Sequence, residues 1–439
     1  MKYNFPVKDL YLARTVLQPD FDIFNYPDLY VNLDAIRINS RFQDYRRNIK
    51  RALNLDENTG QLKPLIENNY PKILFTGFRG SGKTTELKKL QQELSGPDKY
   101  YTVFIELEQE YNITRFQFED FYFIIFYNFS KLVNNDPALK KVSGILDELI
   151  RDLISDKQIE EEIRKRSSIS LGGGGSLGAN LLKIFRANVD IKTEFSTSSK
   201  IAEKIRTTIK RRLGEIIDNF NEKIRHIRNE IRRQNKGRDI LFILDGLEKV
   251  PLDIYDQLIV KDNYALRNIN ASIITAIPIE AQYLADKRVV QDMFTTFLLP
   301  VIRVDDPHNR FLMSQVVSRR IDIETFFESE KVLDYLVLMS GGLIRQLFKL
   351  VSYCLLYGSN YKITLDEAKE LVQAYGQSMF EYLNSKQIKL LKDFKAGKKK
   401  IIPANNDDGV LLYNSFLLKH NGHYIINPVI EDFLNEARR

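Results

Sequence analysis

One run of eight residues carries the clearest chemistry in the chain. The pattern G-x-x-x-x-G-K-[ST] is matched in full by Gly77-Phe78-Arg79-Gly80-Ser81-Gly82-Lys83-Thr84. Glycines let the backbone turn tightly around phosphate oxygens, and N–H groups at the start of the following helix supply partial positive charge. Lys83 would reach the β- and γ-phosphates, and the Thr84 hydroxyl would ligate Mg²⁺. We therefore predict ATP and Mg²⁺ as cofactors, bound by Gly77, Arg79, Gly80, Ser81, Gly82, Lys83, Thr84 and Thr85.

A phosphate loop of this kind needs a carboxylate near the metal, at the end of a neighbouring strand. Asp245 closes the apolar run LFILD and is predicted to hold Mg²⁺ together with Thr84. Many ATPases of the additional-strand type place the water-activating glutamate directly after this aspartate, where this chain has Gly246. Glu248 is the candidate to serve instead, and the alternative is that it is a solvated loop acid. ATP binding is therefore predicted, whereas fast hydrolysis is not.

Two further polar residues are candidates to complete the site. Thr275 lies near the end of the predicted strand SIITA, where it could orient the water that attacks the γ-phosphate; the alternative is a buried threonine bonded to backbone. Arg345 lies about 200° around a predicted helix from Leu343. It would therefore point away from the apolar face of that helix and could reach a phosphate. The alternative for Arg345 is an exposed surface arginine.

The order of the predicted elements favours an α/β fold with a parallel sheet. Apolar runs predict strands at 71–76, 101–107, 239–244, 271–276 and 297–299, and a helix follows the glycine loop. We divide the chain into a lead-in segment (1–55), a P-loop ATPase core (56–305), a helical lid (306–380) and a winged-helix-like domain (381–439). The last is predicted to contain a helix at 386–394, a strand at 400–402, a helix at 410–418, a hairpin at 423–427 and a helix at 429–437.

The ATPase core contains a predicted insert at 156–238. Its first part has four consecutive glycines, Gly172 to Gly175, and the alternating stretch ANVDIKTEF, which predict a hairpin or flexible flap at 167–199. Its second part, 200–234, repeats apolar residues at steps of three or four, as one face of a long helix does.

The positive charge of the chain is concentrated in this insert. Residues 200–238 hold 13 Lys and Arg and five Asp and Glu, a net charge of +8, against +7 for the whole chain. The basic helix could bind phosphates of DNA or RNA, which would make binding salt-dependent. The alternative is a solvated face that packs on an acidic neighbour in an oligomer. A second basic cluster, at 386–400, lies in the winged-helix-like domain and could grip backbone phosphates.

The composition excludes several classes of protein. The chain has 439 residues, 44% hydrophobic and 28% charged, so it is too apolar to be disordered and too long for one compact core. Its single cysteine, Cys354, leaves no disulfide framework, so we expect a reducing, cytoplasmic setting and a place for Cys354 in the lid core. The four histidines lack ligand spacing for zinc. The longest apolar run, Phe121 to Phe129, is about half a membrane span, so no membrane partner is expected.

Several of these motifs together resemble the AAA+ and STAND group of ATPases. They are the GxxGSGKT loop, the strand end DGLEK, a polar residue late in the next strand, the GGxxR helix and the C-terminal winged helix. The chain is most similar to the origin-recognition and replication-initiator branch and to prokaryotic STAND regulators, over about residues 60–435 without the insert. The resemblance implies that Asp245 is the Walker B carboxylate, Thr275 sensor 1 and Arg345 sensor 2. It also implies an arginine finger, for which Arg288 is the candidate, with a solvated arginine as the alternative.

These features predict a slowly hydrolysing ATPase that acts as a switch. It would bind ATP·Mg²⁺, oligomerise with nucleotide and engage DNA, RNA or an effector protein. Its predicted catalytic residues are Lys83, Asp245, Glu248, Thr275 and Arg345. The alternative is a non-catalytic signalling or scaffold ATPase subunit of an anti-phage defence system, which would assemble or restrain a separate effector enzyme.

Overall fold

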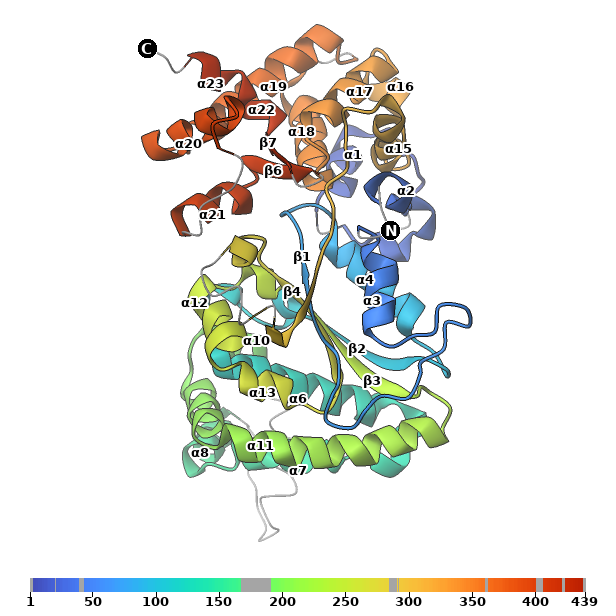
Figure 1. Cartoon of the computed structure of the whole chain (residues 1–439), viewed down its shortest axis with the longest axis vertical. Helices are drawn as coiled ribbons and strands as arrows, with labels where there is room; N and C mark the ends of the chain where they lie inside the picture. The colour runs from blue at the N-terminus through green and yellow to red at the C-terminus, as the bar shows by residue number, and fades with distance from the viewer. Residues whose placement is uncertain are drawn as a thin grey trace.

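The computed structural model of the chain describes residues 3–19, 21–38, 43–166, 191–283, 290, 292–359, 362–399, 406–420 and 423–436. Its centre is a five-stranded parallel sheet in the order β2-β3-β4-β1-β5 (Figure 1). The strand β4 therefore lies between β1, which leads into the P-loop, and β3, which ends at Asp245. The predicted α/β fold with a parallel sheet is confirmed. The strands are β1 Lys72–Thr76, β2 Tyr100–Glu106, β3 Asp239–Asp245, β4 Ser272–Ile277 and β5 Thr295–Leu298.

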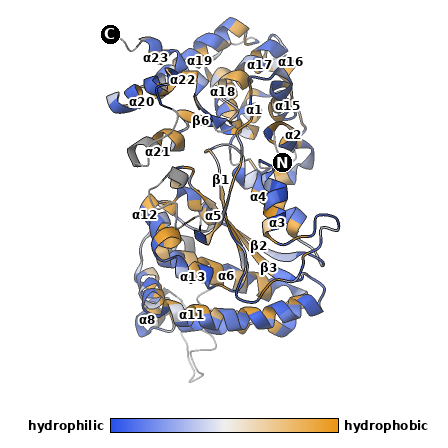
Figure 2. Cartoon of the chain, viewed as in Figure 1, coloured by the Kyte–Doolittle hydropathy of each residue, from blue (hydrophilic) through white to orange (hydrophobic). Residues whose placement is uncertain are grey.

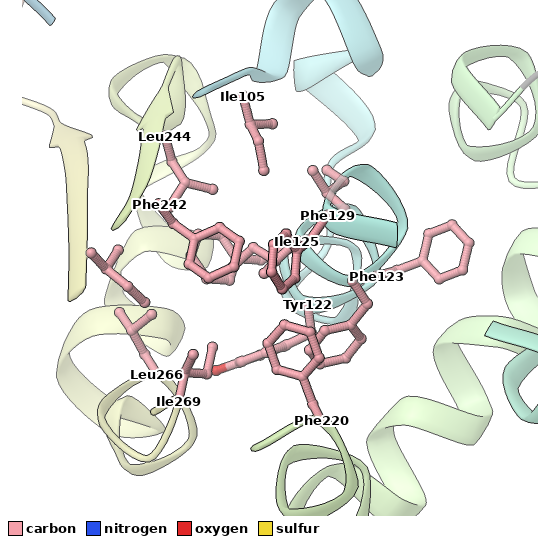
Figure 3. Packing of buried hydrophobic residues seen from close by; sticks show 14 of the residues in the cluster. Ile105, Tyr122, Phe123, Ile125, Phe129, Phe220, Phe242, Leu244, Leu266 and Ile269 are labelled. Atoms are coloured by element: carbon pink, nitrogen blue, oxygen red, sulfur yellow. The ribbon is translucent and has the colours of Figure 1, made fainter. Parts of the chain in front are cut away.

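Different helices cover the two faces of the sheet. Because side chains alternate along a strand, Phe242 and Leu244 of β3 point to one face and Ile243 points to the other. On the first face, the ring of Phe242 packs edge-on against Phe129 of α6, with 5.2 Å between centroids (Figure 3). The second face packs against α4, which begins in the P-loop, and against α3. These helices are α3 Tyr45–Ala52, α4 Lys83–Leu94, α6 Phe118–Asn135 and α7 Ile145–Ile154.

The long basic helix of the predicted insert belongs to the main core. The helix α11 (Lys200–Arg233) lies beside α6 and α7 on the first face of the sheet (Figure 1). Its apolar stripe is buried, as the spacing predicts, and the Phe220 ring lies 4.4 Å from Phe126 of α6. Hydrophilic residues are frequent along the rest of α11 (Figure 2). Neither α11 nor any other helix in the described part of the chain combines the length and apolarity needed to cross a membrane.

Part of the stretch predicted as a hairpin or flap is helical. Residues Ile191–Ser196 form the helix α10, so the strand-like interpretation of ANVDIKTEF is wrong over these residues. The reason is tertiary packing: Phe195 stacks on Phe123 of α6 and meets Tyr111 edge-on, which a single helical turn is sufficient to arrange. The rest of the predicted flap, 167–190, lies outside the described residues. On the other side of that gap, α8 spans Lys157–Arg166.

The N-terminal segment and the helical lid share one core. Val16 of α1 and Ile36 of α2 are buried in the same cluster as Met313, Val351 and Cys354 of the lid. Cys354 is therefore a core residue, as predicted, and burial raises the pKa of its thiol to about 12. The elements are α1 Leu10–Val16, α2 Asp34–Arg37, α15 Pro307–Ser318, α16 Ile323–Phe326, α17 Glu330–Met339, α18 Ile344–Tyr357 and α19 Leu365–Phe380.

The C-terminal domain is a small winged-helix-like unit with an antiparallel hairpin of β6 and β7. Leu417 and Leu418 belong to β6, so the predicted helix 410–418 is wrong at its end. The reason is that both residues pair with β7, opposite Ile426 and Ile425. The strand predicted at 400–402 lies outside the described residues. The elements are α20 Ser385–Lys395, α21 Asn406–Tyr413, β6 Leu417–His420, β7 His423–Ile426, α22 Pro428–Glu431 and α23 Phe433–Glu436.

Candidate nucleotide site

The glycine loop between β1 and α4 has the backbone shape that phosphate binding requires. Gly80 and Gly82 adopt φ values of +83° and +96°, which side-chain-bearing residues rarely adopt. A Cβ on Gly80 would lie 2.4 Å from the Cβ of Arg345, and a Cβ on Gly77 would lie 3.1 Å from the Cβ of Leu299. Gly82 then caps α4, whose first residue is Lys83. The N-terminus of this helix therefore faces the loop with its free N–H groups.

The predicted metal ligands Thr84 and Asp245 are brought together, although 161 positions separate them. The Thr84 hydroxyl donates a hydrogen bond of 2.7 Å to Oδ2 of Asp245. The other carboxylate oxygen of Asp245 is buried and has no hydrogen-bond partner within the described structure. A hydroxyl beside a carboxylate with one unused oxygen is a suitable donor set for Mg²⁺, which prefers oxygen ligands. The residues present therefore fit the predicted cation.

Burial shifts the titration of the charged residues at this site. The pKa of Asp245 is raised to about 7, first because the carboxyl is buried and second because Glu248 is close. Burial also lowers the pKa of Lys83, against the opposing attraction of Glu248 and Asp245. The ammonium of Lys83 donates to the carbonyls of Gly77 at 2.9 Å and Phe78 at 3.2 Å. Lys83 is thus held against the loop that would carry the phosphates.

Glu248 is buried and lies in the wall of the site, so it is not a solvated loop acid. It sits in a short 3-10 turn, Leu247–Lys249, directly after β3. One of its carboxylate oxygens accepts a hydrogen bond of 3.1 Å from the backbone N–H of Gly246. Gly246 has a φ of +104°, which allows the chain to double back at the end of β3. Its role as the water-activating residue stays a prediction.

Thr275 lies inside β4, and its role in orienting the attacking water stays a prediction. It pairs in register with Leu74 and Leu244, and both of these face α6 and α11. Asp245 is one residue further along β3 and therefore points to the opposite face of the sheet. The strand β4 continues to Ile277, two residues beyond Thr275, so the loop that reaches the P-loop begins later than the sequence suggested.

Glu280, after β4, is a buried acid whose charge interacts with that of Lys83, and the sequence interpretation did not single it out. It opens the 3-10 turn Glu280–Tyr283 after β4 and is only 6% exposed. Its Oε2 has no hydrogen-bond partner within the described residues, and burial raises the pKa of the carboxyl to about 7, although the charge of Lys83 opposes this shift. Glu280 lies three residues beyond Ile277, the end of β4, so the rule that identified Asp245, an acid at the end of a buried strand, does not find it.

Arg345 joins the lid to the glycine loop. Its backbone N–H donates to the carbonyl of Gly80 at 3.1 Å, and its side chain lines the same cavity as Lys83. Leu343 and Leu347 on either side of it are buried in cores of the lid and C-terminal domain. The structure thus places Arg345 at the loop, and contact with a phosphate stays a prediction. The other predicted arginine, Arg288, lies outside the described residues.

All four parts of the chain contribute to the cavity beside the loop, which has a volume of about 160 Å³. The N-terminal segment, which the sequence suggested was only a lead-in, supplies Leu29, Tyr30 and Arg37. The C-terminal domain supplies Tyr413, whose ring lies 5.9 Å from the guanidinium of Arg79. A second hollow of about 480 Å³ adjoins Thr84 and Asp245, the predicted metal ligands. The space therefore suits a ligand with an apolar end and a charged end.

The excess charge of residues 200–238 is largely neutralised within the chain. Ten of its 13 basic side chains form ion pairs, two of them, Arg206 with Asp120 and Arg228 with Asp239, in buried positions. The structure is therefore closer to the alternative of a solvated helix face that packs on an acidic neighbour. The acidic residues, however, belong to the same chain and not to another subunit. The paired residues are Lys200, Lys204, Arg206, Arg212, Lys223, Arg228, Arg232, Arg233, Lys236 and Arg238.

Comparison with known proteins finds low-scoring similarity to solved structures. No family model and no curated protein matches the sequence. The Aeropyrum pernix Orc1 protein in complex with DNA has a TM-score of 0.36 at 11% identity, over 96% of each chain. Cdc6p from Pyrobaculum aerophilum has a TM-score of 0.32 at 11% identity, over 93% of this chain and 100% of that one. Such scores are too low to support an argument about fold or function.

The strand order and the loop define the class of this protein directly. It has an AAA+-like P-loop NTPase fold, with a parallel sheet, a helical lid and a C-terminal winged-helix-like domain. The glycine loop follows β1, the metal carboxylate candidate ends β3, and β4 separates the two strands.

Proposed function

We propose that this chain is an ATP·Mg²⁺-binding switch that hydrolyses ATP slowly. The observation that carries the proposal is the packing of the glycine loop into the C-terminal domain. Phe78, inside the loop, is fully buried in one cluster with Leu391, Leu412 and Ile430 of that domain. A loop that closes around phosphates can move a domain that is packed against it, because residues of this one loop contact both the phosphates and the domain.

The proposed roles follow from the positions of the side chains. Lys83 and the N–H groups of the loop bind the phosphates, while Thr84 and Asp245 hold Mg²⁺. Arg345 reaches the γ-phosphate from the lid. Glu248 orients or deprotonates the attacking water, and its buried, hydrogen-bonded position after Gly246 accounts for slow turnover. Mg²⁺, when bound, neutralises phosphate charge.

The switch acts through linkage between nucleotide and domain position. If ATP favours one arrangement of the C-terminal domain, that arrangement must favour ATP by the same factor. Phe78 and Arg79 are neighbours in the loop, and each contacts the C-terminal domain. Nucleotide binding and packing of the C-terminal domain therefore depend on the same few residues of the loop.

We propose that the C-terminal domain carries the binding surface for a partner. We also propose that further copies of the chain assemble with it. Lys386 and Lys389 of α20 are exposed, as are Lys398 and Lys399 after it. These lysines suit phosphates of DNA or an acidic protein surface better than the ion-paired helix α11 does. A STAND-type switch, in which ATP releases a domain for assembly, is the form of mechanism that this arrangement favours.

One experiment tests the proposal. Radius of gyration, particle mass and phosphate release are measured with ATP, ADP and a slowly hydrolysed ATP analogue, each with and without duplex DNA. We expect tight nucleotide binding, slow phosphate release and a different radius or mass with ATP than with ADP. The same radius and mass in all nucleotide states would overturn the switch, and no binding of ATP would overturn the site.

A further inference from the structure

The N-terminal segment places a buried guanidinium against the glycine loop. Arg37, the last residue of α2, is only 1% exposed. Its Nη2 donates a hydrogen bond of 2.6 Å to the backbone carbonyl of Ser81. The same nitrogen would lie 3.4 Å from a Cβ on Gly82, so the guanidinium lies directly alongside the loop.

The charge of Arg37 is balanced from inside the P-loop helix. Its Nη1 donates to Oε1 of Glu86 at 2.9 Å, and Glu86 is 4% exposed in the first turn of α4. The second oxygen of Glu86 accepts a hydrogen bond of 2.8 Å from the Tyr45 hydroxyl and another from Arg46. Both carboxylate oxygens are thus engaged, and Arg37 is locked between Glu86 and Ser81.

The contact with the Ser81 carbonyl determines the direction of a donor in the loop. In a trans peptide the C=O and the following N–H point in opposite directions within one plane. If Arg37 holds the carbonyl of Ser81, the N–H of Gly82 must point away from Arg37. Gly82 caps α4 with a φ of +96°, a conformation that leaves this N–H among the free donors at the start of the helix.

We propose that Arg37 is a positioning residue for nucleotide binding, which keeps the Gly82 N–H directed at the phosphates. The proposal rests on the proposed function, since it assumes that this loop binds ATP. Arg37 acts through the peptide between Ser81 and Gly82, and its pairing with Glu86 prevents it from turning toward the phosphates itself. The N-terminal segment is thereby part of the nucleotide site.

Affinity for ATP and ADP, measured by calorimetry on the full chain, tests this role. We expect Arg37→Ala to lose about tenfold or more in affinity, the amount that one charge-assisted hydrogen bond supports. Arg46→Ala is the matched control, because Arg46 pairs with the same Glu86 and otherwise with Asp34 and Glu93. Methylguanidinium added to Arg37→Ala should restore part of the affinity and leave Arg46→Ala unchanged.

Each outcome decides between positioning and support of the fold. Equal losses in Arg37→Ala and Arg46→Ala, with no recovery in methylguanidinium, would overturn the proposal. If Arg37→Ala does not fold, Arg37→Lys replaces it: the charge beside Glu86 is kept, but the planar fork that serves two acceptors is lost. Arg37→Lys should bind ATP about fivefold more weakly at an unchanged unfolding midpoint, and wild-type affinity in this variant would overturn the proposal. Failure of the wild-type chain to bind ATP would instead refute the proposed function.

Discussion

The ring of Tyr413 lies 5.9 Å from the guanidinium of Arg79, so the last residue of α21 contacts the glycine loop. These two residues are far apart in the sequence and belong to different domains. Their neighbours support the contact: Phe78 is buried among C-terminal residues, and a Cβ on Gly409 of α21 would meet the Cβ of Glu280 at 3.1 Å. The phosphate loop and the C-terminal domain therefore form one packed unit.

Replacing Tyr413 by alanine should loosen the C-terminal domain. A cation–π contact contributes about 0.5 to 2 kcal/mol, so amide hydrogen exchange in 406–420 should accelerate about two- to thirtyfold. Exchange in β1 and β3 should be unchanged, because their cores are separate from Tyr413. Tyr382→Ala is the control, since Tyr382 is 84% exposed near the start of the same domain. Equal exchange in the Tyr413 variant and the wild type would show that the contact does not hold the domain.

Replacing Lys83 by alanine should abolish useful nucleotide binding. The Lys83 ammonium donates hydrogen bonds to two carbonyls of the loop, so it lies where the phosphates would bind. Its loss should weaken ATP binding about 100-fold. Lys63→Ala is a suitable control, because Lys63 is more than half exposed and pairs with Asp56 on the surface. Calorimetric titration with ATP measures both variants. Unchanged affinity in Lys83→Ala would remove the nucleotide site from this loop.

Replacing Glu248 by glutamine should separate binding from hydrolysis. Glutamine preserves the size of the side chain and a carbonyl oxygen that can accept from the Gly246 N–H, so ATP affinity should change little. Loss of a general base lowers a rate by about 100-fold or more, and single-turnover phosphate release should fall accordingly. Glu57→Gln, an exposed acid paired with Arg47, should behave as the wild type. Unaltered phosphate release in Glu248→Gln would leave Glu248 as a structural residue.

Binding of DNA, measured by fluorescence anisotropy over a salt series, should depend on α20 and not on α11. Neutralising Arg212, Arg232 and Arg233 together should change the affinity less than about twofold, because each already pairs with an acid of the same chain. Neutralising Lys386 and Lys389 should reduce the slope of log affinity against log salt by about one for each DNA phosphate that the protein no longer neutralises. The opposite pattern would return the nucleic-acid surface to the basic helix.

The sequence predicted the elements whose signals are local and failed where distant residues decide. The loop at 77–84, the strand ending at Asp245 and the stripe of α11 each depend on neighbours in the sequence, and each is found in the structure. The structure shifts β4 by one residue from the predicted strand at 271–276, because Ile277 also pairs in the sheet, opposite Thr76. Arg37 and Tyr413 carry no motif, so only the packing of the terminal segments identifies them.

The ion pairs of α11 could not be predicted from the sequence for the same reason, because distant residues form them. The count of +8 over 200–238 is correct, but charge in the sequence says nothing about acids brought beside it by folding. Asp152 on α7 and Asp156 before α8 lie against Arg212 and Lys204. Those acids are some 50 to 60 residues away in the chain, beyond the range of any local pattern.

Glu280 should make the stability of the chain fall as pH rises. Burial raises the pKa of its carboxyl from 4.5 to about 7, so the folded state binds more protons than the unfolded state between these values. The stabilisation from the protonated form is complete below pH 4.5 and is lost as pH rises through 7. Between pH 4.5 and about 7, ionisation of Glu280 should lower the free energy of unfolding by about 3 kcal/mol. At higher pH the carboxyl causes no further loss.

The variant Glu280→Gln isolates this contribution, because glutamine stays neutral at every pH. Urea unfolding without nucleotide, from pH 4.5 to 8, should give a smaller fall in stability for Glu280→Gln than for the wild type. Asp245, whose pKa is also raised to about 7, titrates in the same window and accounts for the slope that remains. The exposed variant Glu57→Gln should follow the wild-type curve, apart from a small change from its surface ion pair. Parallel curves for Glu280→Gln and the wild type would mean that this carboxyl titrates as an ordinary exposed acid.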